Sequence, residues 1–353
     1  MQCVYKPCIP SASYPPQLRL QNSNPNLSIP KTQTQIQIPS KFLDNTIQDN
    51  DINDASSGSG LANLPLPSHV KSITSTSNPF VKHCLKLRNS SSHRHAHGSA
   101  LVVGSTPIRE IFRCQESLQE KTTGIDCLLL LDKAEIPDGL DNYSNRIVRI
   151  NTLIMKKLSG VQSTESIEAI ALMRMPTTFL NLDVDQELGC RSWFGSPHRV
   201  LVLDGIQDPG NLGTLLRSAV AFRWGGIYLL PDCCDPFNEK ALRASRGASF
   251  QLPIVSGSWC HLQTLKTEFQ MKMLAGHPDS NRLSKPVSSL SQEFVDSLSD
   301  VPLCLVLGSE GHGLSEKSQD ECELVSIPMA GDYESLNVSV AGGIFLYMLQ
   351  PIK

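Results

Sequence analysis

Residues 198–222, HRVLVLDGIQDPGNLGTLLRSAVAF, decide the fold of this chain. The apolar run at 200–203 predicts a short buried strand, and the DPGN sequence that follows is typical of a turn. Residues 212–222 predict a helix, so the stretch indicates a strand, a loop and a helix in succession, as in α/β proteins. This arrangement would place Asn211 at the tip of the loop and Arg217 on the second turn of the helix.

The same stretch carries residues suited to a phosphate-bearing ligand. Gly210 and Gly213 would let another group approach the backbone closely. The guanidinium of Arg217 presents a planar fork of donors that matches a phosphate. Taken alone, these residues are also compatible with an ordinary turn and helix.

A second stretch, LCLVLGSEGHGLS at 303–315, predicts an apolar strand that ends in a glycine-rich turn able to wrap a nucleoside. The turn lacks the G-x-G start of the dinucleotide fingerprint, and no helix with a ribose-binding acid follows it. A nicotinamide cofactor is therefore not expected.

A third stretch, VSIPMAGDYESLNVSVAGGIFLYML at 325–349, predicts a strand over 324–327, a loop, and a helix that begins near Ser335. Ser335 is a suitable N-cap because its hydroxyl can accept a hydrogen bond from a free backbone N–H of the first turn. The small residues of this helix would permit close packing against a neighbouring element.

The segment 71–113 is basic. It holds seven Lys or Arg, four His and a single acid. A helix over 79–87 would put Lys82 and Lys86 on one face. Strands at 101–105, around Leu128 and at 146–150 would complete a small α/β unit with helices over 106–113, where Thr106 is the expected N-cap, and 152–158. The segment is either an ordinary solvated surface or a module whose Lys and Arg neutralise RNA phosphates.

The HRHAH tract at 93–97 contains three of those histidines. Histidine-rich tracts can bind metal ions. Because the tract lies between a predicted helix and a predicted strand, we expect a flexible loop here and no metal site.

The N-terminal segment 1–43 contains no Asp or Glu and four basic residues, with many Ser, Pro, Gln and Asn. Such a segment cannot bury enough apolar surface to offset the entropy of ordering it, so we expect disorder. It is either a nonspecific terminus or an organelle transit peptide, and its single Arg and its prolines favour a plastid over a mitochondrion. Residues 44–69 are typical of a linker.

The composition of the whole chain excludes several classes of protein. The 353 residues carry a net charge of -3, which excludes a uniformly basic nucleic-acid coat but leaves room for a local basic patch. The eleven cysteines form no CxxC pair, which favours free thiols in a reducing compartment over a metal or disulfide framework. No apolar run is long enough to span a bilayer.

In this order and spacing the three stretches resemble the SpoU (TrmH-type) branch of the SPOUT superfamily of RNA 2'-O-ribose methyltransferases. The resemblance covers about 198–350. It extends to NEKALRASRGASFQLPI at 238–254, and the segment before it resembles the small ribosomal-protein-type domain often fused ahead of such enzymes. The residues that carry the resemblance are Asn211, Gly213, Arg217, Gly308, Glu310, Gly311, Gly313, Ile327, Pro328, Met329, Ser335, Leu336, Asn337, Ser339 and Ala341.

The resemblance implies an α/β fold class in which a trefoil-knotted methyltransferase domain follows a small α/β RNA-binding domain and a disordered N-terminal segment. The corresponding boundaries are 1–69 for transit peptide and linker, 70–180 for the RNA-binding domain, 181–196 for an interdomain linker and 197–353 for the methyltransferase domain. It also implies the methyl donor S-adenosylmethionine as cofactor, against Leu307, Gly308, Ile327, Met329 and Leu336.

By the same resemblance, the catalytic set would be Asn211, Arg217, Glu310, Ser335 and Asn337. A guanidinium stays protonated in nearly all proteins, so we expect Arg217 to hold the phosphate beside the target ribose and to stabilise a developing alkoxide rather than to act as a base. The RNA-binding residues would be Lys71, Lys82, Lys86, Arg88 and Arg243.

Three questions stay open at this point. The partner would be a structured RNA, with ribosomal RNA favoured over transfer RNA. The family is typically dimeric, so the final helix is either a homodimer interface or an element buried within one subunit. A noncatalytic RNA-binding relative that helps to assemble ribosomes is the alternative to an enzyme, and it would have no chemical need for the catalytic set.

Overall fold

The structure, a computed structural model, describes residues 72–119, 121–140, 146–164, 166–182, 189–278 and 285–351. These residues belong to one compact unit, Leu61–Lys353. The predicted transit peptide and linker at 1–69 and the predicted RNA-binding residue Lys71 lie outside the described residues.

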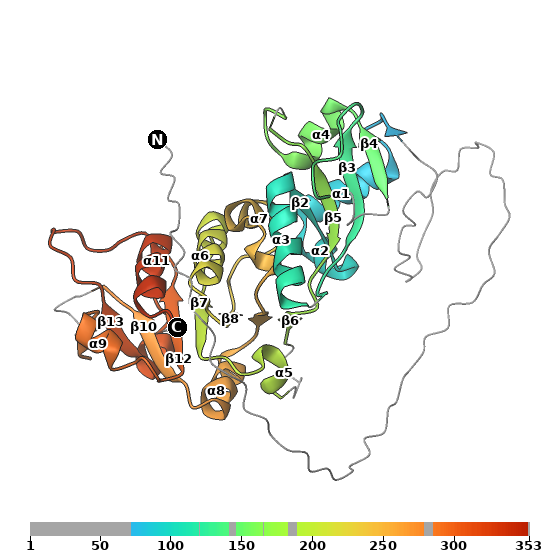
Figure 1. Cartoon of the computed structure of the whole chain (residues 1–353). Helices are drawn as coiled ribbons and strands as arrows, with labels where there is room; N and C mark the ends of the chain where they lie inside the picture. The colour runs from blue at the N-terminus through green and yellow to red at the C-terminus, as the bar shows by residue number, and fades with distance from the viewer. Residues whose placement is uncertain are drawn as a thin grey trace, which may run out of the picture. The chain divides into compact units, whose positions relative to one another are not determined.

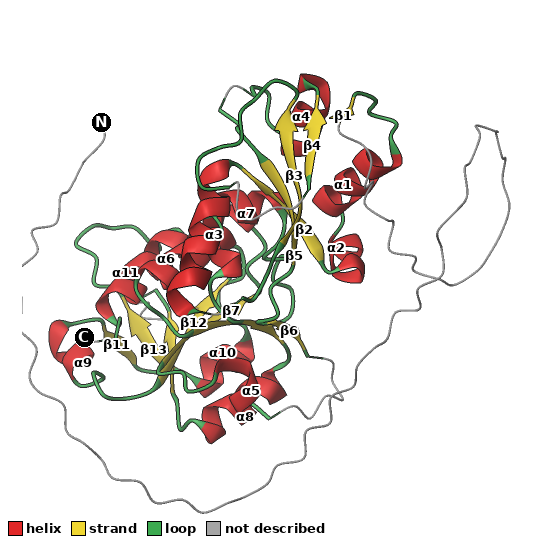
Figure 2. Cartoon of the chain, turned by 45° about the vertical axis from the view of Figure 1, so that its right-hand side comes forward, coloured by secondary structure: helices red, strands yellow, loops and turns green. Residues whose placement is uncertain are grey.

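The first domain contains, in chain order, β1 (Ser72–Ile73), α1 (Pro79–Asn89), α2 (Ser91–His97), β2 (Ser99–Val103), α3 (Ser105–Leu118), β3 (Ile125–Leu131), β4 (Ile147–Ile150), α4 (Thr152–Ser159) and β5 (Ile170–Arg174). Its five strands form a mixed sheet in the order β1-β4-β3-β5-β2. β1, β4 and β3 are parallel, whereas β5 is antiparallel to β3 and to β2. Figures 1 and 2 show α1 and α2 next to this sheet.

Two local predictions in this domain are wrong. The HRHAH tract belongs to α2 and is not a loop. Ser90, which ends α1, accepts a hydrogen bond from the backbone N–H of His93, and Gly98 ends α2 in the left-handed conformation, so both ends of this short helix are capped. α3 begins at Ser105, before Thr106, and the Ser105 hydroxyl bonds Glu168 instead of capping the helix.

The second domain contains β6 (Phe179–Asn181), α5 (Arg191–Phe194), β7 (Arg199–Asp204), α6 (Pro209–Ala221), β8 (Gly226–Leu229), α7 (Glu239–Ser245), a 3-10 turn (Ala248–Phe250), β9 (Ile254–Ser256), α8 (Trp259–Glu268), β10 (Lys272–Gly276), β11 (Val287–Ser289), α9 (Gln292–Asp296), β12 (Leu303–Gly308), α10 (Glu316–Glu321), β13 (Glu323–Ser326) and α11 (Val338–Met348). Its eight strands form a sheet in the order β11-β13-β10-β12-β7-β8-β9-β6. Every pair in this sheet is parallel. The predicted α/β fold class is confirmed.

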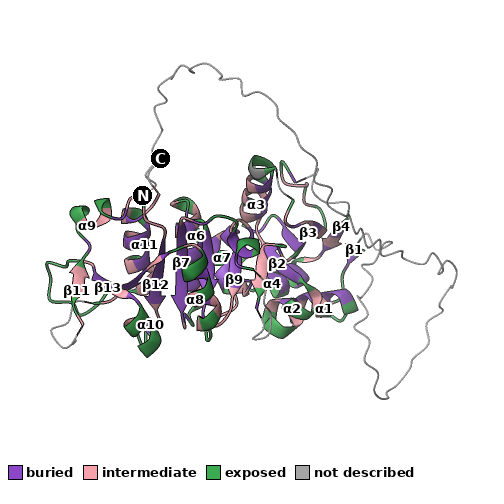
Figure 3. Ribbon diagram, turned by 90° about the horizontal axis from the view of Figure 1, so that it is seen from below, coloured by how far each residue is buried: buried purple, intermediate pink, exposed green. Residues whose placement is uncertain are grey.

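Both faces of the second sheet are covered. All six residues of β7 are buried. Leu201 and Leu203 contribute to a core beneath α6 and α11, whereas Val200 and Val202 contribute to a second core beneath α5 and α8. This alternation explains the continuous apolar run in the sequence, because a parallel strand with helices on both sides needs no polar face. Figure 3 shows the buried strands between helices with exposed outer faces.

The region 181–196, predicted to be an irregular linker, contains ordered elements at both of its ends. β6 pairs in parallel with β9 and forms the edge of the second sheet. α5 buries Trp193 and Phe194 in the core beneath it. The sequence offered little signal for α5, since a four-residue helix is too short to show a periodic pattern.

The two domains share one apolar core. Phe237, Leu242 and Phe250 of the second domain pack with Ile108 and Ile111 of α3. The Phe237 ring meets the Phe250 ring edge-on, with 5.4 Å between their centroids. Burial of large apolar side chains is a major source of stability, so the packing of these residues against α3 stabilises the association of the two domains.

A buried ion pair also stabilises the contact between the two domains. Arg94 of α2 is 2% exposed, and its Nε and Nη2 lie 2.9 and 2.6 Å from Oδ2 of Asp235. Its Nη1 donates to the carbonyls of Leu87 and Arg88, at 2.7 and 3.0 Å. Arg94 therefore connects the end of α1, α2 and the second domain.

Another buried arginine holds the end of α11. Arg199, at the start of β7, donates from Nε to the Leu349 carbonyl at 2.8 Å, and its Nη atoms donate to the carbonyls of Leu298 and Val301. Burial lowers the pKa of the Arg199 guanidinium to about 10, so it remains charged at neutral pH. These bonds tie the end of α11 to the 298–301 turn and to the start of β7.

No described helix is long and apolar enough to cross a membrane. The cysteines among the described residues are free thiols, and most of them are buried. Burial raises the pKa of the Cys84 and Cys304 thiols well above the ordinary range, so these cysteines are packing residues and not nucleophiles.

Candidate functional site

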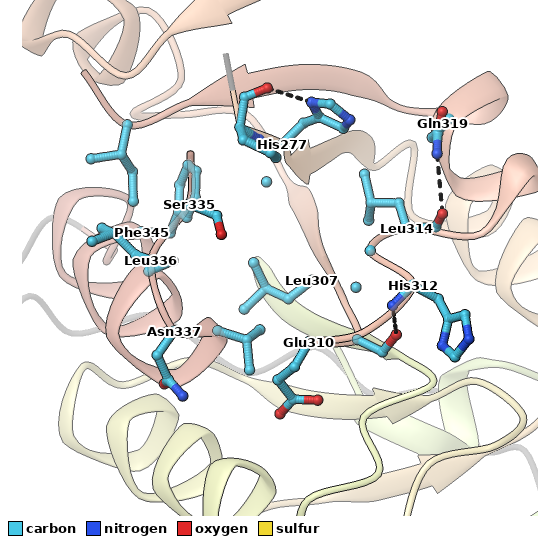
Figure 4. Close-up of a pocket in the computed structure, with 18 of the residues that line it drawn as sticks. His277, Leu307, Glu310, His312, Leu314, Gln319, Ser335, Leu336, Asn337 and Phe345 are labelled. Carbon is cyan, nitrogen blue, oxygen red and sulfur yellow. Dashed lines mark hydrogen bonds between the residues drawn. The ribbon is translucent and has the colours of Figure 1, made fainter. Parts of the chain in front are cut away.

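A cavity of about 430 Å³ opens at the carboxyl ends of β10, β12 and β13 (Figure 4). Its walls are the segment after β10, the glycine-rich turn after β12, the loop after β13 and the first turns of α11. In open parallel sheets ligands bind outside the carboxyl ends of the strands. The volume is in the range of small-molecule sites.

The turn after β12 requires glycine at its first position. Ser309 and Gly313 exchange two backbone hydrogen bonds of 2.9 Å each, which closes the turn tightly. A Cβ atom on Gly308 would lie 2.3 Å from the carbonyl carbon and oxygen of Gly313 and 2.4 Å from the Leu314 nitrogen. The neighbours are backbone atoms that cannot rotate away, so only glycine fits.

A buried carboxylate anchors this turn to the centre of the sheet. Asp204, at the end of β7, accepts hydrogen bonds from the backbone N–H of Ser315 at 2.9 Å and from the Ser318 hydroxyl. Ser315 is the N-cap of α10. The floor of the cavity is thus fixed on β12 and on the adjacent strand.

The loop after β13 leads into α11, whose N-cap is Asn337 and not Ser335 as predicted. The Asn337 side-chain oxygen accepts from the backbone N–H groups of Ser339 and Val340, at 2.9 and 3.4 Å. Ser335 instead lines the cavity. Further along the helix Gly342 packs so closely on Leu215 that a Cβ would lie 2.2 Å from a methyl group of that residue.

Three polar residues from the three sequence stretches meet at the rim of the cavity. Asn211 donates from Nδ2 to the Glu310 carboxylate, and Asn337 donates from Nδ2 to the Asn211 side-chain oxygen at 3.3 Å. Figure 4 shows Glu310 and Asn337 at the same edge of the cavity. All three are partly or fully exposed, so the chain of hydrogen bonds is accessible to a ligand from solution.

The start of α6 differs from the prediction. The helix begins at Pro209 with Asp208 as N-cap, so Asn211 lies in the first helical turn and not at a loop tip. Arg217 is consequently on the third turn, on the exposed face of α6. Across the described parts of the chain, no residue pairs with its guanidinium, which leaves all its donors available.

The structure brings most of the predicted site residues to one place. The cavity lining includes the predicted cofactor residues Leu307, Gly308, Ile327, Met329 and Leu336 and the predicted catalytic residues Glu310, Ser335 and Asn337. Asn211 reaches this set through its hydrogen bonds, whereas Arg217 is not among the lining residues.

Sequence reasoning missed the part of the wall that follows β10. Gly276, His277 and Pro278 line the cavity, as does Phe345 of α11. A Cβ on Gly276 would lie 2.9 Å from the Phe345 ring. The available signal was an apolar run ending in glycine, the same pattern that marked the strand before Gly308.

The predicted RNA-binding residues fall into two groups. Lys82 and Lys86 are exposed on α1. Arg88 and Arg243 both contact Glu239 of α7, with Nη2 to carboxylate distances of 3.3 and 2.6 Å. Arg88 therefore links α1 to α7, and Arg243 forms an ion pair within α7, whereas the two lysines are directed to solvent.

Residues 198–347 match the model of the SpoU rRNA Methylase family. An uncharacterized tRNA/rRNA methyltransferase of Synechocystis is 32% identical over 287 residues, which cover 80% of this chain and 94% of that protein. The 23S rRNA (guanosine(2553)-2'-O)-methyltransferase RlmP of Bacillus subtilis is 26% identical over 80% of this chain and 100% of its own length.

Solved structures show the same fold. The SpoU methyltransferase AviRb of Streptomyces viridochromogenes, in complex with AdoMet, is similar with a TM-score of 0.61 and 22% identity, over 77% of this chain and 97% of its own. An AdoMet-bound rRNA methyltransferase of Sinorhizobium meliloti gives a TM-score of 0.62 and 22% identity, over 79% and 97% of the two chains. The motifs, the parallel sheet and the relative from Synechocystis agree, and the chain belongs to the SpoU family of RNA 2'-O-ribose methyltransferases.

Proposed function

We propose that this chain uses S-adenosylmethionine to methylate a ribose 2'-hydroxyl in an organellar RNA, with ribosomal RNA as the substrate. The main observation in support is the chain of hydrogen bonds that connects Asn211, Glu310 and Asn337 at the rim of the cavity. The wall of this cavity includes a turn that admits only glycine at position 308. A protein that only binds RNA would have no need of such an arrangement.

The residues of the cavity fit S-adenosylmethionine. The side chains of Leu307, Ile327 and Leu336 supply apolar walls for an adenine ring, and Gly308 lets the turn after β12 close tightly beside them. Backbone groups of the turn can read the polar edge of the base. When bound, S-adenosylmethionine supplies an electrophilic methyl group, which an aligned ribose oxygen accepts as its proton leaves.

The remaining residues have roles that follow from their positions. Asn211, Glu310 and Asn337 orient the nucleotide at the rim, and Ser335 shapes the adjoining wall. Arg217, exposed and unpaired within the described residues, holds the phosphate next to the target ribose. Its charge also stabilises the oxygen as negative charge develops on it.

Replacing Arg217 with Ala is expected to lower methyl transfer by about a hundredfold or more, because one fixed charge at the reacting oxygen is lost. S-adenosylmethionine binding should change little, since Arg217 does not line the cavity. The measurement is incorporation of labelled methyl groups into RNA, with calorimetry for the cofactor.

Arg191→Ala is the matched control, because Arg191 lies on α5 and forms an exposed ion pair with Glu268. Full methyl transfer by the Arg217 variant would contradict the role proposed for this residue. Absence of methyl incorporation in the unmodified chain, with RNA binding retained, would favour the noncatalytic alternative.

The exposed lysines of α1 support RNA contact by the first domain. Lys82 and Lys86 are one helical turn apart and free to meet backbone phosphates. The similarity to RlmP along its whole length favours ribosomal RNA. The acid-poor N-terminal segment favours an organelle, a plastid over a mitochondrion.

The RNA target can be found by mapping 2'-O-methyl groups in organellar RNA from cells that lack the protein. We expect one ribosomal RNA ribose to lose its methyl group. Loss confined to transfer RNA would overturn the choice of substrate, and an unchanged organellar methylation map would overturn the location.

We further propose that α11 forms a homodimer interface. Val340 and Tyr347 on this helix are 52% and 57% exposed, and Met329 and Leu336 of the preceding loop are also partly exposed. Apolar groups gathered on one surface are typical of contact sites. The position of this surface beside the cavity would let a second subunit complete the site.

Replacing Tyr347 with Glu is therefore expected to convert a dimer into a monomer, because a carboxylate would be buried without a partner. Light scattering after gel filtration measures the mass. Leu153→Glu is the control, since Leu153 of α4 is similarly exposed, at 58%, but lies in the first domain. A dimer that survives Tyr347→Glu and dissociates with Leu153→Glu would place the interface elsewhere.

A further inference from the structure

Three histidines of the first domain converge between α1 and α2. His93 and His97 are four residues apart on α2 and so share one face, and His83 of α1 faces them. One ring nitrogen of each lies within 4.8 Å of the others. We propose that His83, His93 and His97 bind a divalent transition metal ion of the zinc class.

The spacing of the nitrogens is close to what such an ion needs. His83 Nδ1 and His93 Nε2 are 3.1 Å apart. Two nitrogens that are each about 2.0–2.1 Å from a tetrahedral zinc ion are separated by about 3.4 Å. The ligand nitrogen of His97 already lies within 4.8 Å of the other two, so a rotation of its ring would bring it to a similar distance.

His97 is oriented by a second hydrogen bond of the kind found around bound metals. Its Nδ1 lies 2.9 Å from the backbone oxygen of His93, which can only accept, so Nδ1 carries the proton. The lone pair is then on Nε2 and is free to bind a metal ion. A carbonyl partner on the other ring nitrogen is typical of metal-binding histidines.

The composition of the cluster indicates the class of ion. The described residues supply no carboxylate to it, which disfavours calcium and magnesium, whose ligands are oxygens. Imidazole suits zinc, copper and nickel. Three protein nitrogens leave a fourth position for water.

The ion would fix α1 against α2. These helices carry the exposed Lys82 and Lys86 and the buried Arg94, so the proposed site lies between a basic surface and the domain contact. The HRHAH tract, expected from sequence to be a metal-free loop, thus supplies two of the three proposed ligands once α2 has formed.

The test uses the full chain, stripped of metal with a chelator and titrated with Zn²⁺ by calorimetry. We expect saturable binding of one ion, weakened more than about tenfold by His93→Ala or by His97→Gln. His95→Gln is the matched control, since His95 lies on the same helix but beside Asp235, 3.6 Å away, and Gln retains a donor for it. Circular dichroism checks that each variant is folded.

Co²⁺ provides a second measurement, because its absorption spectrum distinguishes nitrogen from sulfur ligands. We expect a spectrum without thiolate-to-metal bands. Absence of binding, binding that survives both histidine variants, or thiolate bands from the free cysteines would each overturn the proposal. None of these outcomes bears on methyl transfer, so this proposal and the proposed function fail separately.

Discussion

Replacing Gly308 with Ala is expected to weaken S-adenosylmethionine binding by about a hundredfold, since overpacking of this kind costs up to about 3 kcal/mol and each 1.4 kcal/mol is tenfold. The added methyl group would overlap backbone atoms of Gly313 and Leu314. Either the turn shifts into the cavity or it opens, and in both cases the wall beneath the ligand is lost. Calorimetric titration with the cofactor measures the effect.

The same turn provides the control. A Cβ on Gly311 would meet no atom within 4 Å, and this residue does not have the left-handed backbone that restricts Gly313. Gly311→Ala should therefore bind the cofactor within about twofold of the unmodified chain. If Gly308→Ala bound as tightly as Gly311→Ala, the turn after β12 would not be the cofactor site.

Replacing Arg94 with Ala is expected to lower the free energy of unfolding by about 3 to 5 kcal/mol at neutral pH, because it leaves the buried Asp235 carboxylate without its counter-charge. Arg191→Ala, which removes an exposed ion pair with Glu268, should cost less than about 1 kcal/mol. Urea unfolding measures both. Equal effects of the two variants would show that the Arg94 pair does not hold the domains together.

The effect of Arg94→Ala should also depend on pH. Burial alone would raise the pKa of Asp235, but the hydrogen bond with His95 and the charge of Arg94 outweigh it and hold that pKa well below its ordinary value of 3.8. A depressed carboxylate pKa contributes stability that is complete above the unfolded-state pKa and is lost as the pH falls below it. The difference between the unmodified chain and the variant should therefore be largest near neutral pH and narrow as the pH falls, because the Asp235 carboxylate becomes protonated at a higher pH in the variant.

The sequence predicted the parallel-sheet domain well, because its strands are apolar runs that end in turn residues. The strand before Asp204, the strand before Gly308 and the strand before Pro328 all form, each close to its expected bounds. A strand that is buried on both faces needs apolar residues at nearly every position, and such a run is easy to detect in a sequence. The residues chosen from the family resemblance for the cofactor are also found together around one cavity.

Helix starts were harder to predict. Ser335 and Asn337 are both good N-caps, as are Ser105 and Thr106, so local propensity does not choose between them. At α11 Asn337 also donates to Asn211, a contact across the fold that local propensity does not include. The wall after β10 was missed for a similar reason, since His277 has no motif of its own and acquires its place only from the order of the strands.

The hydrogen-bonded chain of Asn211, Glu310 and Asn337 has a consequence for biosynthesis. Its links span 99 and 126 residues of sequence, and its last member begins α11. The cavity therefore cannot exist on the ribosome until synthesis has passed residue 348, even though β7 and α6 can form long before. A chain interrupted before that point would carry the earlier strands and helices without a completed ligand site, so ligand binding would report that synthesis has passed α11.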